Sequence, residues 1–136
     1  MPAALLTGSV DLDTMERYFT VEDLALIVGE SPKWISKQRD AGVIAPVLFK
    51  GRQQYGRGAI LRLEAFKGLQ EEFGHNSAMP ALIVKEAGPR LDELGRRQPD
   101  VYTVDALNAL SDAVMAAVWT DEVQAELARR FGALAK

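Results

Sequence analysis

Three cationic side chains lie within one short stretch of the chain, at Lys33, Lys37 and Arg39. Ammonium and guanidinium groups bind phosphate oxygens strongly, so the chemistry available here is contact with an anion. Ser31 can cap the first turn of a helix, Pro32 suits its first position, and Gly42 can adopt the left-handed conformation that ends one. The stretch therefore predicts a short cationic helix over residues 32–41.

The distribution of charge sets this helix apart from the rest of the chain. The 136 residues carry a net charge of −3, but residues 30–62 hold seven basic and two acidic residues, a local charge of +5. The remainder has nine basic and seventeen acidic residues, a charge of −8. A basic segment in an acidic protein is typical of local phosphate contact, and a solvated charged face has the same composition.

The residues before the cationic helix predict a second, scaffolding helix. Thr20 and Asp23 resemble a capping box, and apolar residues follow at the spacing of a buried helical face over 21–28. The turn at Gly29 then leads into the cationic helix, which is the signature of a helix-turn-helix. In this arrangement Ile35 points inward, and Trp34 is predicted to pack against a neighbouring helix.

The outer side of the cationic helix carries Lys33, Ser36 and Lys37 in its N-terminal half. That half of a recognition helix reaches base edges in the major groove of DNA. Two short strands over 47–49 and 53–55 are predicted to follow, with Lys50-Gly51-Arg52 at the tip of the hairpin. A tip with two cations is a candidate to lie against phosphates.

The rest of the chain is predicted to be helical. An amphipathic helix runs from Ala59 to about Gly74, and the polar stretch 75–77 is a candidate domain boundary. Helices over 80–87 and 90–97 are expected to be separated by Gly88-Pro89, and Pro99 ends the second. Two more helices, capped by Thr103 and Thr120, are expected to form an αα-hairpin or to lie across a partner. Residues 1–16 are predicted to be a flexible N-terminal arm, with a turn of helix near 13–17.

Residues 18–73 resemble the DNA-binding domain of the MerR family of bacterial regulators. The resemblance rests on the order and spacing of these segments: Tyr18-Phe19-Thr20-Val21-Glu22-Asp23-Leu24-Ala25, Val28-Gly29, residues 31–44, Pro46, Gly51-Arg52, Tyr55 and the helix over 61–69. The chain is also similar to phage excisionases and to the DNA-recognising small subunit of some phage terminases.

The resemblance implies a winged helix-turn-helix. The second helix would enter the major groove with Lys33, Ser36 and Lys37 at bases or phosphates, and the wing, with Arg52 and Tyr55, would lie on the backbone. The family dimerises through one long helix after this domain, and Gly88-Pro89 and Pro99 are expected to interrupt that helix here. We therefore expect a mostly α fold in three parts: arm 1–16, winged helix-turn-helix 17–75 with a small β-hairpin wing, and an all-α region 76–136.

Other functional classes find little support in the residues. The chain has no cysteine, which excludes thiolate catalysis, Cys-based zinc sites and cysteine-based metal sensing. No Gly-rich phosphate loop, metal-ligand cluster or Ser/His/Asp set is visible, so no enzyme, cofactor or metal site is predicted. No run of about 18 apolar residues predicts a membrane span. The expected location is the cytoplasm, on the nucleoid when DNA is bound.

The leading hypothesis is a sequence-specific double-stranded DNA-binding protein, a bacterial or phage transcriptional regulator that forms a homodimer through its C-terminal helices. A phage excisionase or packaging subunit, whose C-terminal half would bind another protein, is the first alternative. A protein-interaction adaptor on a winged-helix scaffold is the second. The candidate DNA contacts are Lys33, Ser36, Lys37, Arg39, Lys50, Arg52, Tyr55 and Arg57.

Overall fold

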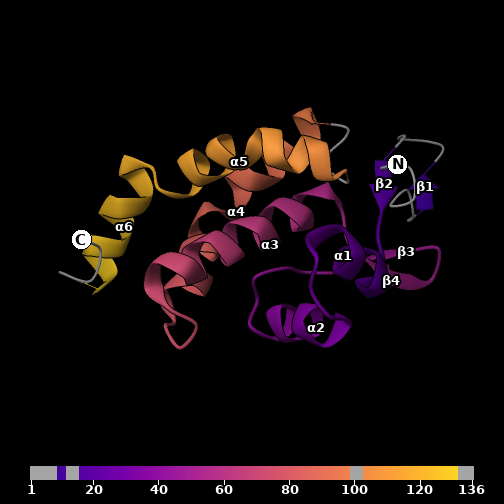
Figure 1. Ribbon diagram of the computed structural model, residues 1–136, viewed down its shortest axis with the longest axis horizontal. Coiled ribbons are helices and arrows are strands. Elements are labelled where there is room, and N and C mark those ends of the chain that lie inside the picture. The colour runs from indigo at the N-terminus through magenta and orange to yellow at the C-terminus, as the bar shows by residue number, and fades with distance from the viewer. Residues whose placement is uncertain (1–8, 12–15, 99–102, 132–136) are drawn as a thin grey trace.

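The computed structural model describes residues 9–11, 16–98 and 103–131 (Figure 1). Within these ranges six helices and two small antiparallel sheets follow one another, which confirms the expected mostly α fold class. The helices are α1 Val21–Val28, α2 Pro32–Asp40, α3 Arg57–Phe73, α4 Met79–Arg97, α5 Val104–Val118 and α6 Asp121–Phe131. The strands are β1 Ser9–Asp11, β2 Glu16–Tyr18, β3 Val47–Phe49 and β4 Arg52–Gln54.

Helices α1 and α2 have the termini that their capping residues predict. The Thr20 hydroxyl accepts from the Asp23 N–H, and the Asp23 carboxylate accepts from the Thr20 N–H at 2.9 Å, which completes the capping box. Gly29 ends α1 in the left-handed conformation, with φ of 75°. The Ser31 hydroxyl then accepts from the Trp34 N–H at 3.1 Å and starts α2. Local sequence therefore accounts for where α1 begins and ends and where α2 begins.

The inner side of α2 is anchored by one apolar and one aromatic contact. Ile35 is fully buried, and the Trp34 ring meets the Phe66 ring of α3 edge-on, with centroids 5.9 Å apart. The prediction that Trp34 is a packing residue is confirmed. Gln38 is also buried, and its amide nitrogen donates to the Trp34 carbonyl at 3.2 Å. These contacts leave the opposite face of α2 in solvent.

The β3–β4 hairpin is one residue tighter than the sequence predicts. Lys50 and Gly51 both have positive φ, 54° and 74°, as a two-residue type I′ turn requires. Arg52 therefore begins β4 instead of completing the tip, and Tyr55 follows the strand instead of ending it. Asn-Gly is the usual sequence of this turn, and Lys50-Gly51 shares only its glycine.

The turn of helix predicted near residues 13–17 is wrong where the structure describes it, and residues 9–11 of the predicted N-terminal arm form a strand. Strand β1 pairs with β2 in antiparallel register, and Glu16–Tyr18 is a strand, not a turn of helix. Tyr18 stacks on Phe49 with ring centroids 4.6 Å apart, and Phe19 exchanges backbone hydrogen bonds of 2.8 and 2.7 Å with Tyr55. These long-range contacts hold β2 against the end of β4. Residues 1–8 and 12–15 of the predicted arm lie outside the described residues.

Helix α4 is continuous, so the break predicted at Gly88-Pro89 is wrong. Pro89 lies inside the helix, where a missing N–H and a ring clash cost about 3 kcal/mol. The packing of α4 along α3 offsets this cost. A side chain at Gly88 would collide with the Arg62 guanidinium, and one at Gly58 would collide with the Asp92 carboxylate. Glycines thus allow the two helices to approach closely, and α4 ends at Arg97, before Pro99 as predicted.

A bidentate ion pair joins α3 and α4. The Arg62 Nε donates to Asp92 Oδ1 at 2.9 Å, and Nη2 donates to Oδ2 at 2.7 Å. Nη1 of the same side chain donates to the Val43 carbonyl at 3.4 Å, in the segment between α2 and β3. One arginine therefore connects α3, α4 and the chain that leaves α2.

A single hydrophobic core extends through both halves of the chain. Its buried residues come from the helix-turn-helix segment, α3 and the three C-terminal helices alike, including Leu24, Ile60, Leu91 and Leu127. The boundary proposed after residue 75 falls in the turn between α3 and α4, but the core continues across it. Helix α5 packs on α3 and α4, while α6 turns away and contacts α4 (Figure 1). The two last helices therefore form no αα-hairpin.

Asp92→Asn tests the ion pair as a stabilising contact. The Arg62 side chain is only 20% exposed, so it would keep a charge that no longer has an anionic partner, at an expected cost of about 1–3 kcal/mol in unfolding free energy. Urea denaturation measures this change. Glu93→Gln is the control, because its pairs with Arg96 and Arg97 are exposed to solvent and are expected to contribute little to stability. Equal losses for both variants would contradict the assigned role.

Candidate nucleic-acid interface

The predicted contact residues of α2 and of the β3–β4 turn lie on the surface of the same half of the molecule (Figure 1). Lys33 and Lys37 are exposed on α2, with Ser36 half-buried between them. Lys50 and Arg52 are exposed at the hairpin, where the Lys50 ammonium lies 5.3 Å from the centre of the Phe49 ring. The opposite end of the molecule is formed by α6.

These cations differ from the other cations of the protein in their ion pairing. Across residues 9–11, 16–98 and 103–131, no carboxylate lies within ion-pair distance of five cations: Lys33, Lys37, Lys50, Arg52 and Lys85. In the same ranges, the C-terminal helices have their arginines in ion pairs, for example Arg90 with Glu122 at 3.7 Å and Arg130 with Glu86 at 2.6 Å. Positive charge without an internal counter-charge is therefore concentrated around α2 and the hairpin.

Lys85 belongs to this set although the sequence gives no sign of it. It lies on α4, and its side chain covers the turn after α2, because a methyl group at Gly42 would come within 2.8 Å of Lys85 Cε. Gly42 has a φ of 82°, as predicted for the residue that ends this turn. Gly42 is distant from Lys85 in the sequence, so only the packing of α4 on the rest of the protein reveals that this cation is near α2.

Two of the residues predicted to contact DNA, Tyr55 and Arg39, are instead buried or paired within the fold. Tyr55 is 1% exposed, so its side chain is not available on the surface. Burial raises the pKa of its hydroxyl, and the nearby Arg39 charge opposes that rise. Arg39 itself is half-buried and donates to the Asp40 carboxylate at 3.2 Å from two nitrogens. Both residues support the hairpin and the end of α2 from behind the surface.

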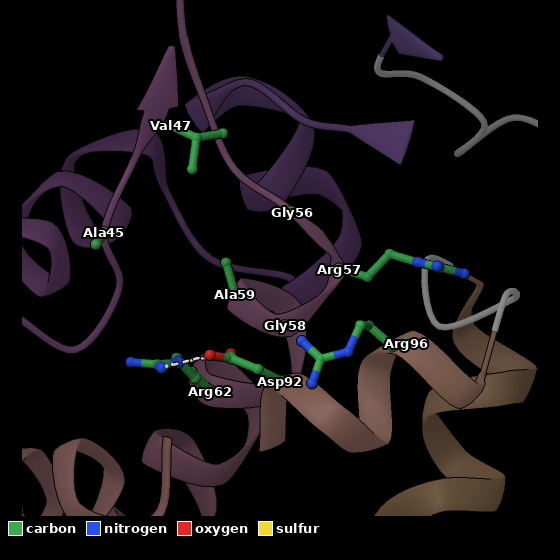
Figure 2. Close-up of a pocket in the computed structure, with 9 residues that line it drawn as sticks. All are labelled: Ala45, Val47, Gly56, Arg57, Gly58, Ala59, Arg62, Asp92 and Arg96. Atoms are coloured by element: carbon green, nitrogen blue, oxygen red, sulfur yellow. Dashed lines mark hydrogen bonds and ion pairs between the residues drawn. The ribbon is translucent and has the colours of Figure 1, made fainter. Parts of the chain in front are cut away.

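Arg57 lies apart from α2, in a cavity beside the α3–α4 contact (Figure 2). The first turn of α3, residues 56–59, forms one wall, with Ala45 and Val47 on a second side. Asp92 and Arg96 of α4 complete the lining together with Arg62 of α3, and Figure 2 shows Arg62 and Asp92 side by side, joined by their ion pair. Because the Asp92 carboxylate in this cavity is already paired with Arg62, we interpret the cavity as part of the packing contact between α3 and α4.

A lysine of α3 holds the turn of the helix-turn-helix segment. The Lys67 ammonium donates to the Val28 carbonyl at 2.5 Å and lies 3.6 Å from the Glu30 carboxylate. A cation at the C-terminal carbonyls of α1 is favoured by the helix dipole. One turn earlier on α3, burial raises the pKa of Glu64, Lys67 lowers it, and Glu30 raises it further. Lys67, Glu30 and Glu64 therefore interact with one another and with the end of α1.

Comparison with protein-family models, curated proteins and solved structures finds no match for this chain. In the described residues, no group of three or more His, Asp or Glu side chains is arranged to hold a metal ion. Of the helices described, none has both the length and the apolar character needed to cross a membrane. The interface is therefore judged on its own geometry and charge.

Glu64→Gln tests the electrostatics beneath the interface. A carboxyl whose pKa is raised in the folded state binds protons more readily there than in the unfolded chain, so its ionised form opposes folding at neutral pH. We expect Glu64→Gln to raise the melting temperature at pH 7. This gain should disappear as the pH falls below 4.5, the ordinary pKa of the group. Glu71→Gln, at an exposed position of the same helix, is the control, and a gain that is independent of pH would contradict the assignment.

Proposed function

We propose that this chain is a sequence-specific double-stranded DNA-binding protein and a regulator of transcription. Residues 17–75 form a winged helix-turn-helix in this proposal, with α2 in the major groove and the β3–β4 hairpin as a wing on the sugar-phosphate backbone. The support comes from the helix-turn-helix geometry, the tight hairpin and the surface charge. The resemblance of residues 18–73 to MerR-type domains agrees with this assignment.

The observation that carries the proposal is the location of the unpaired cations. Four of the five described cations that lack a carboxylate at ion-pair distance lie on α2 or at the hairpin turn, and the fifth, Lys85, covers the turn after α2. Each ion pair elsewhere satisfies a cation within the fold, whereas these five remain free to neutralise phosphates. A solvated charged face that binds no ligand would give no reason for the unpaired cations to be concentrated around one helix and one turn.

The side chains predicted to contact DNA have different roles in the proposed complex. Lys33, Ser36 and Lys37 face outward from the N-terminal half of α2 and would meet base edges or the phosphates beside them. Lys50 and Arg52 would hold the hairpin on the backbone, and Lys85 would add a phosphate contact from α4. Arg39, Tyr55 and Arg57 are left out of direct contact, because they pack within the scaffold or line the α3–α4 cavity.

The proposal includes a homodimer formed through the C-terminal helices. An apolar groove between α4 and α5 is lined by Pro89, Leu94, Ala113, Ala116 and Ala117, and its rim carries Arg90, Glu93 and Arg97. Helix α5 has two charged residues, both of them exposed aspartates. The α5 helix of a second copy would match this groove in apolar character, as a self-complementary two-fold contact requires.

Lys33→Ala combined with Lys37→Ala tests the DNA contact. Duplexes selected by the unmodified protein from genomic fragments should bind this variant at least tenfold more weakly, since each direct base contact contributes about 1–3 kcal/mol. Arg129→Ala combined with Arg130→Ala is the matched control. It removes the same charge from α6, outside the proposed DNA surface and the proposed dimer groove. Unchanged affinity of the Lys33/Lys37 variant, or an equal loss in the control, would contradict the proposal.

Ala116→Trp tests the dimer. A large side chain at this exposed position would fill the groove, so we expect sedimentation equilibrium to show a monomer where the unmodified chain is a dimer. Ala128→Trp, exposed on α6, should remain dimeric. An unmodified chain that sediments as a monomer at all concentrations would contradict the homodimer and leave the DNA assignment to its own test.

A further inference from the structure

A methionine of α5 lies against α3 at a glycine. Met115 is half-buried, and its side chain packs against the hydrophobic core. A Cβ atom at Gly68 of α3 would come within 3.1 Å of the Met115 Sδ and within 3.8 Å of its Cε. The thioether therefore occupies space that the missing side chain of Gly68 leaves, and its sulfur atom is part of the packing of α5 on α3.

The same methionine lines a cavity of 210 Å³ between α3 and α5. Three other residues of the lining, Glu71, Asn108 and Ser111, are exposed, so the cavity opens to solvent. A small polar molecule can therefore reach the side chain of Met115 while the protein remains folded.

Sulfur chemistry in this chain belongs to methionine, because the sequence has four methionines and no cysteine. Two of the four, Met79 and Met115, lie among the described residues. When hydrogen peroxide oxidises a thioether, a sulfur lone pair attacks one peroxide oxygen and the O–O bond breaks. The proton on the transferred oxygen passes to the departing hydroxide, so the products are a sulfoxide and one water. Sulfur loses two electrons and peroxide gains them, and methionine sulfoxide reductases reverse the change.

We propose that Met115 is a site of reversible oxidation by hydrogen peroxide, and that its sulfoxide weakens the contact between α5 and α3. Oxidation makes an apolar side chain polar and adds an oxygen atom at the sulfur. On the side of Gly68 there is no room for that atom. Elsewhere in the cavity lining lie Leu107 and Val114, which are buried and apolar. A polar S–O group held against them loses hydration without gaining a hydrogen bond, so the oxidised side chain favours a position farther from α3.

Movement of α5 would change the surface proposed for the homodimer, and this part of the inference rests on the proposed function. Ala113, Ala116 and Ala117 line the groove between α4 and α5, and they lie on either side of Met115 in the same helix. A groove lined by such small side chains depends on the position of the helix that carries them. Oxidation of Met115 should therefore weaken the dimer.

The other described methionine provides a matched control. Met79 is also half-buried against the core, but it is the first residue of α4. Its backbone N–H donates to the Ser77 hydroxyl at 3.1 Å, in the turn that precedes the helix. A sulfoxide at this helix end leaves the contact between Met115 and Gly68 in place, so we expect it to change stability little.

Peroxide treatment of the purified full chain tests the site, with Met115→Leu and Met79→Leu as the paired variants. Leucine keeps nearly the same volume, and such exchanges usually preserve the fold. Peptide mass spectrometry should show one added oxygen at Met115, and the melting temperature of the unmodified chain should fall by about 5 °C. Met79→Leu should show the same fall, and Met115→Leu should show none. Methionine sulfoxide reductases should restore the melting temperature of the unmodified chain.

Met115→Gln imitates the sulfoxide without an oxidant, because glutamine is a polar side chain of similar length. We expect it to melt as the oxidised protein does. Sedimentation equilibrium should give this variant, and the oxidised unmodified chain, a dimer dissociation constant about tenfold higher than that of the reduced chain. Reduced and peroxide-treated Met115→Leu should have equal dissociation constants.

Each outcome decides one claim. The proposal is overturned if Met115 gains no oxygen under conditions that oxidise Met79, or if Met115→Leu loses as much thermal stability as the unmodified chain. A fall in melting temperature with an unchanged dissociation constant would overturn only the effect on the dimer. If the reduced chain is already a monomer, the proposed homodimer fails, while the mass and melting measurements still decide the oxidation site. None of these measurements uses DNA, so a failure of the proposed DNA binding is seen separately.

Discussion

The ion pair between Arg62 and Asp92 is the contact on which the arrangement of the protein depends. It joins α3 to α4 through two hydrogen bonds of 2.9 and 2.7 Å, and the same guanidinium reaches the Val43 carbonyl at 3.4 Å. Removing charges from water is costly, and a partly buried pair becomes favourable only with good geometry and further hydrogen bonds, both of which are present here. The glycines at 58 and 88 are what leave room for the two charged side chains.

Cations of the scaffold and cations of the surface are used differently. Lys67 donates to the end of α1, and Arg62 donates to the segment after α2, so these positive charges hold the helix-turn-helix segment against α3 and α4. Apart from Arg39, which pairs with Asp40, the cations of α2 and of the hairpin have no carboxylate at ion-pair distance among the described residues. Net charge alone conceals this division, because an acidic protein can still present a local surface of uncompensated positive charge.

Local signals predicted the helix-turn-helix segment well, and long-range contacts account for what they missed. Thr20, Gly29, Ser31 and Gly42 act on their immediate neighbours, so the termini of α1 and the start of α2 could be read directly. The strand at Glu16–Tyr18 depends on Phe49 and Tyr55, which lie far along the chain. Pro89 has a strong local tendency to break a helix, and packing against α3 overrides it. For the site, spacing gave Lys33 and Lys37, whereas the position of Lys85 required the folded chain.

The most direct test of the central claim is the salt dependence of binding to a selected duplex. If the five cations without internal partners each neutralise a phosphate, the logarithm of the association constant should fall with the logarithm of the salt concentration at a slope of about −4.5. A slope near zero, or no binding to any duplex at low salt, would contradict the claim that this surface binds DNA.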